Sequence, residues 1–225
     1  MSYTKVVRCG ELDCIVPLDV LAPPDEADLP TIVLIGGDGT FDQRRYLDVL
    51  AGEVARRGAV VFLSSYRSAT TVNGLTDSLH DVRCSVRYAR SVTAEHGGDP
   101  QTVVLVGHSY GSNLALQTAV TLDAETDGCL ATGDGVPEAV VGLSEFHVAS
   151  MADVPSPPPP VLLGGGSDDP LSETGPKTEE QLREAGFEAE YREFSDTGHE
   201  ELIDPRLTPG VLDLIFEAVA SAEAG

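Results

Sequence analysis

The chain has 225 residues, of which 14 are lysine or arginine and 37 are aspartate or glutamate, so its formal net charge at pH 7 is −23. This length suffices for one large α/β domain and is too short for two domains with complete cores. A surface this negative repels nucleic acid and anionic lipid, and no apolar window approaches the roughly 20 residues of a membrane-spanning helix. We therefore expect a single domain, residues 1–225, with no nucleic-acid and no membrane partner.

The N-terminal residues and the cysteines bear on the compartment and on metal binding. The first five residues lack the basic stretch and apolar segment of a signal peptide, so we expect a cytoplasmic protein. The four cysteines, Cys9, Cys14, Cys84 and Cys129, have no paired metal-type spacing, and no metal or organic cofactor is expected. We expect them to be reduced and mostly buried; the alternative is a Cys9–Cys14 disulfide across an N-terminal hairpin.

Short apolar runs alternate with segments of helical period, the pattern that builds a parallel sheet with helices on both faces. The predicted strands are two within a hairpin over 5–20, then 31–35, 59–63, 102–106, 139–143, 161–163 and 188–194. The predicted helices are 42–57, 77–96, 112–120, one that starts with a capping box at Thr178 and ends at Gly186, and one that starts at Thr208–Pro209. The fold class is therefore α/β, with a mostly parallel eight-stranded sheet.

Three arginines lie on one face of the helix predicted over 77–96, opposite an apolar stripe that includes Val82 and Val86. These are Arg83, Arg87 and Arg90. A basic ridge of this kind can bind an anion, but on a helix it is more often a solvated face. We favour the solvated face.

The strand predicted over 102–106 runs into Gly107-His-Ser-Tyr-Gly111, and a helical pattern follows at once. A G-x-S-x-G match alone is weak in a chain with 23 glycines, but a position between a strand and a helix is what a nucleophile turn requires. The two glycines permit a tight turn that lifts the Ser109 hydroxyl above the sheet edge. In this context the sequence resembles the α/β-hydrolase superfamily, in particular its compact esterases and its dienelactone-hydrolase-like and prolyl-oligopeptidase-like domains.

A serine needs a histidine to take its proton and an acid to orient that histidine. The resemblance implies the chain order serine, acid, histidine. It selects Asp169, which lies in a G-x-x-D-P sequence, and His199, which follows the last predicted strand. Asp168 is the adjacent alternative acid. Glu145, after an earlier strand, is another, because some members of the superfamily place the acid there.

Acyl transfer also needs two N–H donors aimed at the charge that develops on the acyl oxygen. By resemblance, one donor is the Tyr110 backbone N–H and the other comes from the loop after the first buried strand. That loop reads Gly36-Gly-Asp-Gly39 in place of the family's usual His-Gly start. The second donor is thus Asp38, with its carboxylate turned away, or Gly37 if the register is shifted by one residue.

Further residues are predicted to lie around the pocket. Glu145 and His147 follow one strand, and Arg67 lies in a segment that either contacts substrate or is structural, as it often is in the family. His108 is expected to be packed behind the nucleophile. About 17 residues separate the strands over 139–143 and 161–163, which is too few for a sizeable cap domain, so we expect an open site.

These residues predict a serine hydrolase that cleaves a carboxylic ester or a related acyl bond through an acyl-enzyme on Ser109. The same triad serves an acyltransferase or a thioesterase, and the sequence does not distinguish them. A non-catalytic binding protein on the same fold is the alternative of a different class. The expected partner is a small-molecule acyl substrate, neutral or cationic in view of the acidic surface; substrate identity and oligomeric state stay open.

Overall fold

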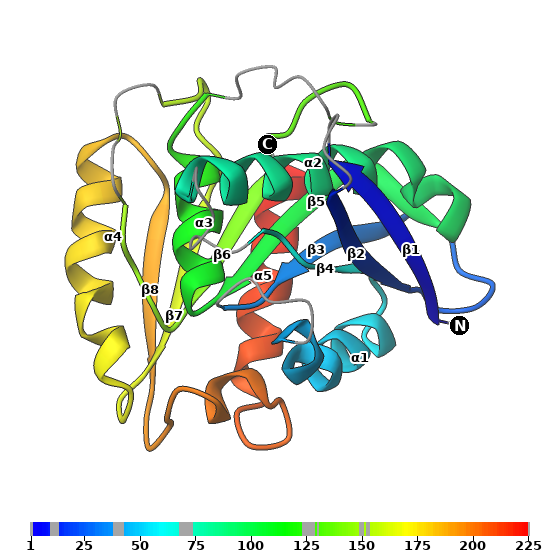
Figure 1. Ribbon diagram of the computed structural model, residues 1–225. Coiled ribbons are helices and arrows are strands. Elements are labelled where there is room, and N and C mark those ends of the chain that lie inside the picture. Colours follow the sequence, from blue (N-terminus) through cyan, green and yellow to red (C-terminus); the bar gives the residue numbers. More distant parts are fainter. Residues whose placement is uncertain are drawn as a thin grey trace.

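Eight strands form one sheet in the computed structural model, which describes residues 2–9, 14–37, 43–67, 74–122, 129, 131–148, 151 and 154–224 (Figure 1). The strands are β1 Ser2–Cys9, β2 Cys14–Leu21, β3 Leu29–Ile35, β4 Val60–Ser64, β5 Gly98–His108, β6 Ala139–Leu143, β7 Val161–Gly166 and β8 Ala189–Phe194. Their order is β1-β2-β4-β3-β5-β6-β7-β8. Only the β1–β2 and β2–β4 pairs are antiparallel. The predicted mostly parallel, eight-stranded sheet is confirmed.

Helices cover both faces of this sheet (Figure 1). The α-helices of the described residues are α1 Asp48–Arg56, α2 Leu75–Val92, α3 Tyr110–Ala119, α4 Gly175–Glu184 and α5 Gly210–Ala224. Helices α2, α3 and α4 bury Val86, Leu114 and Leu182 in the apolar cluster on one face. Helices α1 and α5 bury Leu50 and Leu214 in the cluster on the other. Between β6 and β7 the described residues hold no helix or strand, so this part of the chain adds no cap.

The start of α4 differs from the prediction. The capping box at Thr178 is wrong, because α4 begins at Gly175 and has Pro176 in its first turn. Proline fits that turn because its fixed φ is helical and its missing N–H would have had no partner there. Thr178 lies inside the helix, and its hydroxyl donates to the Phe146 carbonyl at 3.3 Å. The Thr178 side chain, which we expected to cap the start of α4, instead forms a hydrogen bond from α4 to the segment after β6.

The arginines of α2 are not a solvated face, so that interpretation is wrong. Arg83 and Arg87 are only 8% and 4% exposed. Arg83 donates to the Thr121 carbonyl, Arg87 to the Gly133 carbonyl, and Arg90 to the Val136 carbonyl, over distances of 2.9–3.1 Å. The described residues 121–122, 129 and 131–138, here called the crossing segment, therefore contact α2. The guanidinium groups satisfy carbonyls that this contact removes from water.

A disulfide fixes the same crossing. Cys84 of α2 is bonded to Cys129, 45 residues later in the sequence, so the expectation of reduced cysteines is wrong for this pair. The other two cysteines, Cys9 and Cys14, occupy facing register positions of β1 and β2. Two cysteines 45 residues apart, in no recognisable motif, gave no sequence signal for their pairing.

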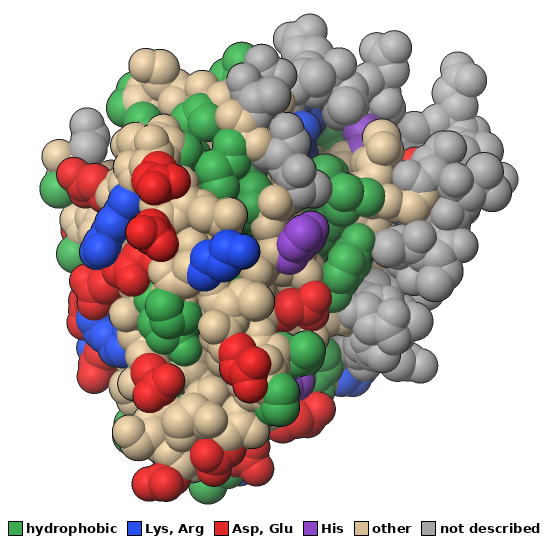
Figure 2. Space-filling model, turned by 90° about the vertical axis from the view of Figure 1, so that its left-hand side faces the viewer, with side chains coloured by type: hydrophobic (Ala, Val, Ile, Leu, Met, Phe, Trp, Pro, Cys, Tyr) green, Lys and Arg blue, Asp and Glu red, His purple; other side chains and the backbone are tan. Residues whose placement is uncertain are grey.

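The surface over α4 and β8 is acidic. Figure 2 shows the side of the molecule that carries α4 and β8, and on it aspartate and glutamate side chains are spread with few basic ones between them. Arg192 of β8 pairs with Glu190 and Glu217, at 2.9 and 2.7 Å. None of the helices in the described residues is both long enough and apolar enough to cross a bilayer.

The contact between α3 and β3 gives a first prediction. A Cβ added at Gly111 would lie 2.5 Å from the Gly36 carbonyl oxygen and 2.8 Å from that of Ile35, and backbone atoms cannot move aside cheaply. We expect Gly111→Ala to lower the free energy of unfolding by about 1–3 kcal/mol, the usual cost of overpacking. Urea unfolding measures it. The matched control is Gly52→Ala in α1, where the nearest atom belongs to the flexible Arg56 side chain at 3.5 Å; we expect it to raise stability by about 0.5–1 kcal/mol.

Candidate functional site

The strand order places a topological switch point at the carboxyl ends of β3 and β5. The chain leaves β3 for β4 on one side and later returns to β5 on the other side of β3. In open α/β sheets, ligands bind at such a switch point, outside the carboxyl ends of the strands. Gly36 and Gly37 follow β3, and Ser109 follows β5. The predicted nucleophile and the predicted oxyanion loop therefore meet where a ligand site is expected.

Ser109 has a strained backbone. Its φ and ψ are 56° and −132°, which a residue with a side chain rarely adopts. Such strain costs about 1–3 kcal/mol and persists only where the surroundings impose it. The Ser109 N–H donates to the Leu143 carbonyl at 2.9 Å, and its carbonyl accepts from the Ser112 N–H at 2.7 Å. A Cβ at Gly107 would overlap the Gly111 carbonyl, so this glycine is what allows the turn.

A buried carboxylate is paired with a histidine near this turn. His199 Nδ1 lies 2.8 Å from Asp169 Oδ2, and Asp169 is only 4% exposed. Asp169 Oδ1 accepts from the Leu171 N–H at 3.0 Å, and Oδ2 also accepts from the Ser172 hydroxyl at 3.2 Å. Burial alone would raise the pKa of Asp169, but the bonds from His199 and Leu171 outweigh it and the pKa is lowered. Asp169 is therefore an anion held against the imidazole.

The two alternative acids have other partners. Asp168 is exposed and accepts from the Ser167 hydroxyl at 3.2 Å. Glu145 accepts from the Asn113 side-chain amide at 2.7 Å. Within the described residues, the carboxylate that the structure brings to His199 is that of Asp169.

His108 connects the histidine loop to the end of β5. Its Nε2 lies 3.0 Å from the His199 carbonyl oxygen, and the two rings are 4.6 Å apart. His199 is thereby held beside the strand end that leads into Ser109. The hydrogen bonds of the described residues do not include one from Ser109 Oγ to His199; catalytic hydrogen bonds are often long before substrate binds and tighten in the complex.

Tyr46, in the short 3₁₀-helix Gln43–Leu47, joins the same network and was not predicted. Its hydroxyl accepts from the Gly37 N–H at 2.5 Å and lies 3.1 Å from His108 Nδ1. Burial raises the pKa of Tyr46 to about 12, so it stays a phenol and can donate to Nδ1. Burial, with the nearby His199, lowers the pKa of His108 to about 3, so its imidazole stays neutral with the proton on Nε2. No local sequence pattern marks Tyr46, because its partners Gly37 and His108 lie 9 and 62 residues away in the sequence.

The oxyanion residues are only partly placed. Tyr110 is the first residue of α3, and first-turn N–H groups have no partner within their helix. A Cβ added at Gly37 would lie 3.1 Å from Ser109 Oγ, so Gly37 borders Ser109, but the Gly37 N–H donates to the Tyr46 hydroxyl. Asp38 lies outside the described residues.

The predicted pocket residues have separate environments. Arg67 forms a two-pronged ion pair with Asp81 of α2, with both contacts at 2.9 Å, so the structure shows it in a structural contact. Glu145 is half-buried. Burial, and after it the nearby Glu145 carboxylate, raises the pKa of Tyr110. His147 is exposed, and its N–H donates to the Asn113 side chain at 2.7 Å.

Comparison with known proteins assigns the chain to a family. The sequence profile of the BD-FAE family matches residues 18–171, more than half of the chain. The chain belongs to the BD-FAE family. The matched stretch includes the strained Ser109 and the Asp169 carboxylate, and His199 lies beyond it.

Solved structures share the fold of this BD-FAE chain. It superposes on an esterase of Thermogutta terrifontis, Est2, with butyrate bound at a TM-score of 0.79 and 22% identity, covering 99% of this chain and 94% of the other. The propionate-bound form gives 0.77 and 21%, and the form phosphonylated by cyclosarin 0.77 and 20%, each with the same coverage. The chain therefore has the α/β-hydrolase fold of these esterases.

One curated relative matches over part of its length. It is named a probable isoprenylcysteine alpha-carbonyl methylesterase, from Oryza sativa subsp. japonica, and is 28% identical over 103 residues. The match covers 45% of this BD-FAE chain and 24% of that protein. The matched stretch of this chain thus spans about a quarter of the relative's length.

The buried His108 gives a second prediction. Because the folded pKa of about 3 lies below the ordinary value of 6.5, the unfolded state binds more protons between these values. The stability that His108 contributes is therefore complete above about pH 6.5 and is lost as the pH falls toward about 3. Urea unfolding between about pH 7 and pH 5 should show falling stability in the wild type and a flatter slope in His108→Gln.

Glutamine carries no ionisable group but keeps an N–H able to reach the His199 carbonyl. Its matched control is His147→Gln, an exposed histidine whose removal takes no buried hydrogen bond with it. A slope identical in the wild type and in His108→Gln would contradict the neutral, buried imidazole.

Proposed function

We propose that this chain is a serine hydrolase that cleaves carboxylic esters, with Ser109, His199 and Asp169 as its catalytic triad. The observation that carries the proposal is the 2.8 Å bond from His199 to the buried Asp169, at the sheet edge where the strained Ser109 turn begins α3. A carboxylate bound to Nδ1 fixes the tautomer that leaves Nε2 free to act as a base. Its charge also stabilises the imidazolium that forms when Nε2 takes the serine proton.

In the proposed reaction, Ser109 Oγ attacks the acyl carbon while its proton passes to His199 Nε2. The Tyr110 N–H, at the positive end of α3, donates to the oxygen that becomes negative. The imidazolium then protonates the leaving alcohol, and an acyl group stays on Ser109. Water, deprotonated by the same histidine, releases the acid. Gly37 borders Ser109, and Asp38, the other candidate for the second oxyanion donor, lies outside the described residues.

The comparisons support an ester as the substrate and a short acyl group. The T. terrifontis enzyme is an esterase and has been seen with propionate and with butyrate, and the rice relative is named a methylesterase. The net charge of −23 and the half-buried Glu145 near Tyr110 favour a neutral or cationic substrate over an anionic one. A single domain, a cytoplasmic location and the absence of any cofactor requirement are part of the same proposal.

A third prediction concerns the nucleophile. A fluorophosphonate should add once to the wild type and not to Ser109→Ala, because the adduct forms on an activated serine. Turnover of a short-chain ester by Ser109→Ala should fall by about 10⁶-fold in kcat, as expected when a triad nucleophile is removed. Intact mass and a chromogenic butyrate ester provide the two readouts. The control is Ser167→Ala, an exposed serine near the acid, which should label and turn over as the wild type.

Absence of an adduct on folded wild type would mean that the triad is not assembled and would favour a non-catalytic binding protein. An adduct that persists in Ser109→Ala would place the reactive serine elsewhere.

A fourth prediction separates the neighbouring aspartates. Asp169→Asn replaces the acceptor of the His199 N–H with a group that cannot stabilise imidazolium, and kcat should fall by about 10⁴-fold. Asp168→Asn is the matched control: its side chain is exposed and meets only Ser167 in the described residues, so kcat should stay near the wild type. Steady-state kinetics on the same ester tests both. The reverse ranking would make Asp168 the acid, and loss of activity in Glu145→Gln alone would move that role to Glu145.

A further inference from the structure

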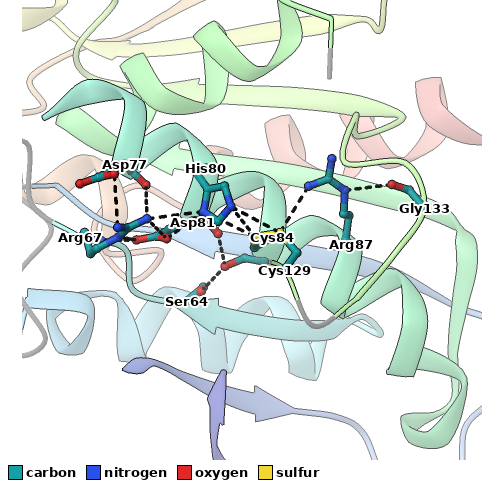
Figure 3. The surroundings of a disulfide bond; sticks show 10 residues. Ser64, Arg67, Asp77, His80, Asp81, Cys84, Arg87, Cys129 and Gly133 are labelled. Atoms are coloured by element: carbon teal, nitrogen blue, oxygen red, sulfur yellow. Dashed lines mark hydrogen bonds and ion pairs between the residues drawn. A yellow bond between two sulfur atoms is a disulfide. The ribbon is translucent and has the colours of Figure 1, made fainter. Parts of the chain in front are cut away.

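The Cys84–Cys129 disulfide lies next to His80 of α2, in a cluster that the proposed hydrolysis does not use. His80 and Cys84 are one helical turn apart on α2, and Cys129 approaches from the crossing segment (Figure 3). His80 Nε2 lies 3.7 Å from Cys84 Sγ and 4.0 Å from Cys129 Sγ. One ligand atom from each residue fits within a span of 4.8 Å.

We propose that reduction of the Cys84–Cys129 disulfide opens a Zn²⁺ site formed by His80 Nε2 and the two cysteine sulfurs. In a tetrahedral site with Zn–S of about 2.3 Å and Zn–N of about 2.0 Å, the nitrogen and each sulfur are about 3.5 Å apart and the sulfurs about 3.8 Å apart. The two nitrogen–sulfur separations are thus already close to the required values. Only the two sulfurs have to move apart, which rotation about the Cα–Cβ bond of either cysteine achieves.

The second nitrogen of the His80 ring faces a carboxylate. His80 Nδ1 lies 3.4 Å from Asp81 Oδ1, and the Asp81 side chain is fully buried. Asp81 is also paired with Arg67, whose Nη2 is 3.5 Å from the same ring nitrogen. A histidine that binds a metal through one nitrogen commonly donates its other N–H to a carboxylate, and Asp81 occupies that position.

The charge around the sulfurs favours thiolates. Arg87 Nη1 lies 3.4 Å from Cys129 Sγ, and a neighbouring guanidinium stabilises a thiolate over a thiol. His80 is 13% exposed and Cys84 is buried, so the cluster is largely, but not fully, screened from water. Two thiolates and an imidazole are ligands that select Zn²⁺ over hard cations, and three protein ligands leave a fourth position for water.

The steps balance with an external dithiol. A dithiol reductant transfers two electrons and two protons to the Cys84–Cys129 bond, which becomes two thiols, while the reductant is oxidised to its own disulfide. Zn²⁺ then binds, and the two thiol protons are released to solvent. Oxidation of the pair removes both sulfur ligands, so the oxidised protein has no such site.

A fifth prediction tests this with Co²⁺ as a spectroscopic probe and Zn²⁺ as competitor. The full-length protein, reduced and freed of reductant without oxygen, should bind one Co²⁺ and show thiolate-to-cobalt charge-transfer absorption that one equivalent of Zn²⁺ removes. The oxidised protein should show neither. His80→Ala keeps both cysteines and should bind at least about tenfold more weakly, since even partners outside the ligand set contribute about 10–100-fold. Cys129→Ser should abolish the absorption.

Two matched controls locate the site. The Cys9→Ser/Cys14→Ser double variant removes the other cysteines, and His147→Ala removes an exposed histidine; both should bind as the wild type. The proposal is overturned if the double variant loses the absorption, if His80→Ala binds unchanged, or if the oxidised protein binds equally well. Circular dichroism of the reduced protein is recorded in parallel, and loss of the fold on reduction would also overturn the proposal because no preformed site would remain.

Discussion

The close approach of α3 to the carboxyl end of β3 is the constraint on which the site depends. Gly111 has no Cβ, so the first turn of α3 lies directly against the Gly36 carbonyl, and Gly107 lets β5 turn into that helix without a clash. The path between the two glycines forces Ser109 into its strained conformation and leaves the Tyr110 N–H at the helix terminus. Protein interiors are packed too densely to open such a contact at low cost. A packing requirement thus positions the proposed nucleophile and a proposed oxyanion donor together.

The Tyr46–His108 pair extends this constraint to the other two loops. One chain of hydrogen bonds runs from the Gly37 N–H through the Tyr46 hydroxyl and the His108 ring to the His199 carbonyl. It joins the loop after β3, the end of β5 and the histidine loop. Because burial keeps His108 neutral, it adds no positive charge beside the imidazolium proposed to form on His199. The charge that faces the His199 ring is therefore the negative charge of the Asp169 carboxylate.

What the sequence could predict follows from how local each signal is. Strand and helix order, and the G-x-S-x-G turn, are encoded by residues a few positions apart, and the structure confirms the elements. The role of Tyr46 depends on Gly37 and His108, which meet it only in the folded sheet. The burial of Arg83 and Arg87 depends on a crossing segment about 40 residues away. The choice between Gly37 and Asp38 as second oxyanion donor could not be made from the sequence for the same reason. The Gly37 N–H is seen to be bonded to Tyr46 only in the folded structure.

The crossing segment is held on α2 in two independent ways, by the Cys84–Cys129 disulfide and by hydrogen bonds from arginines. The second of these does not depend on the disulfide and so persists when the disulfide is reduced. Closing a loop of 45 residues, the disulfide restricts the unfolded chain by an amount worth about 4 kcal/mol in the chain-entropy description. Arg83, Arg87 and Arg90 hold carbonyls on either side of Cys129 whether or not the sulfurs are bonded. Breaking one of these buried contacts would leave a carbonyl unsatisfied, so the segment is expected to stay on α2 after reduction. The arginines thereby keep Cys129 near His80 in the state in which its sulfur is free to bind a metal.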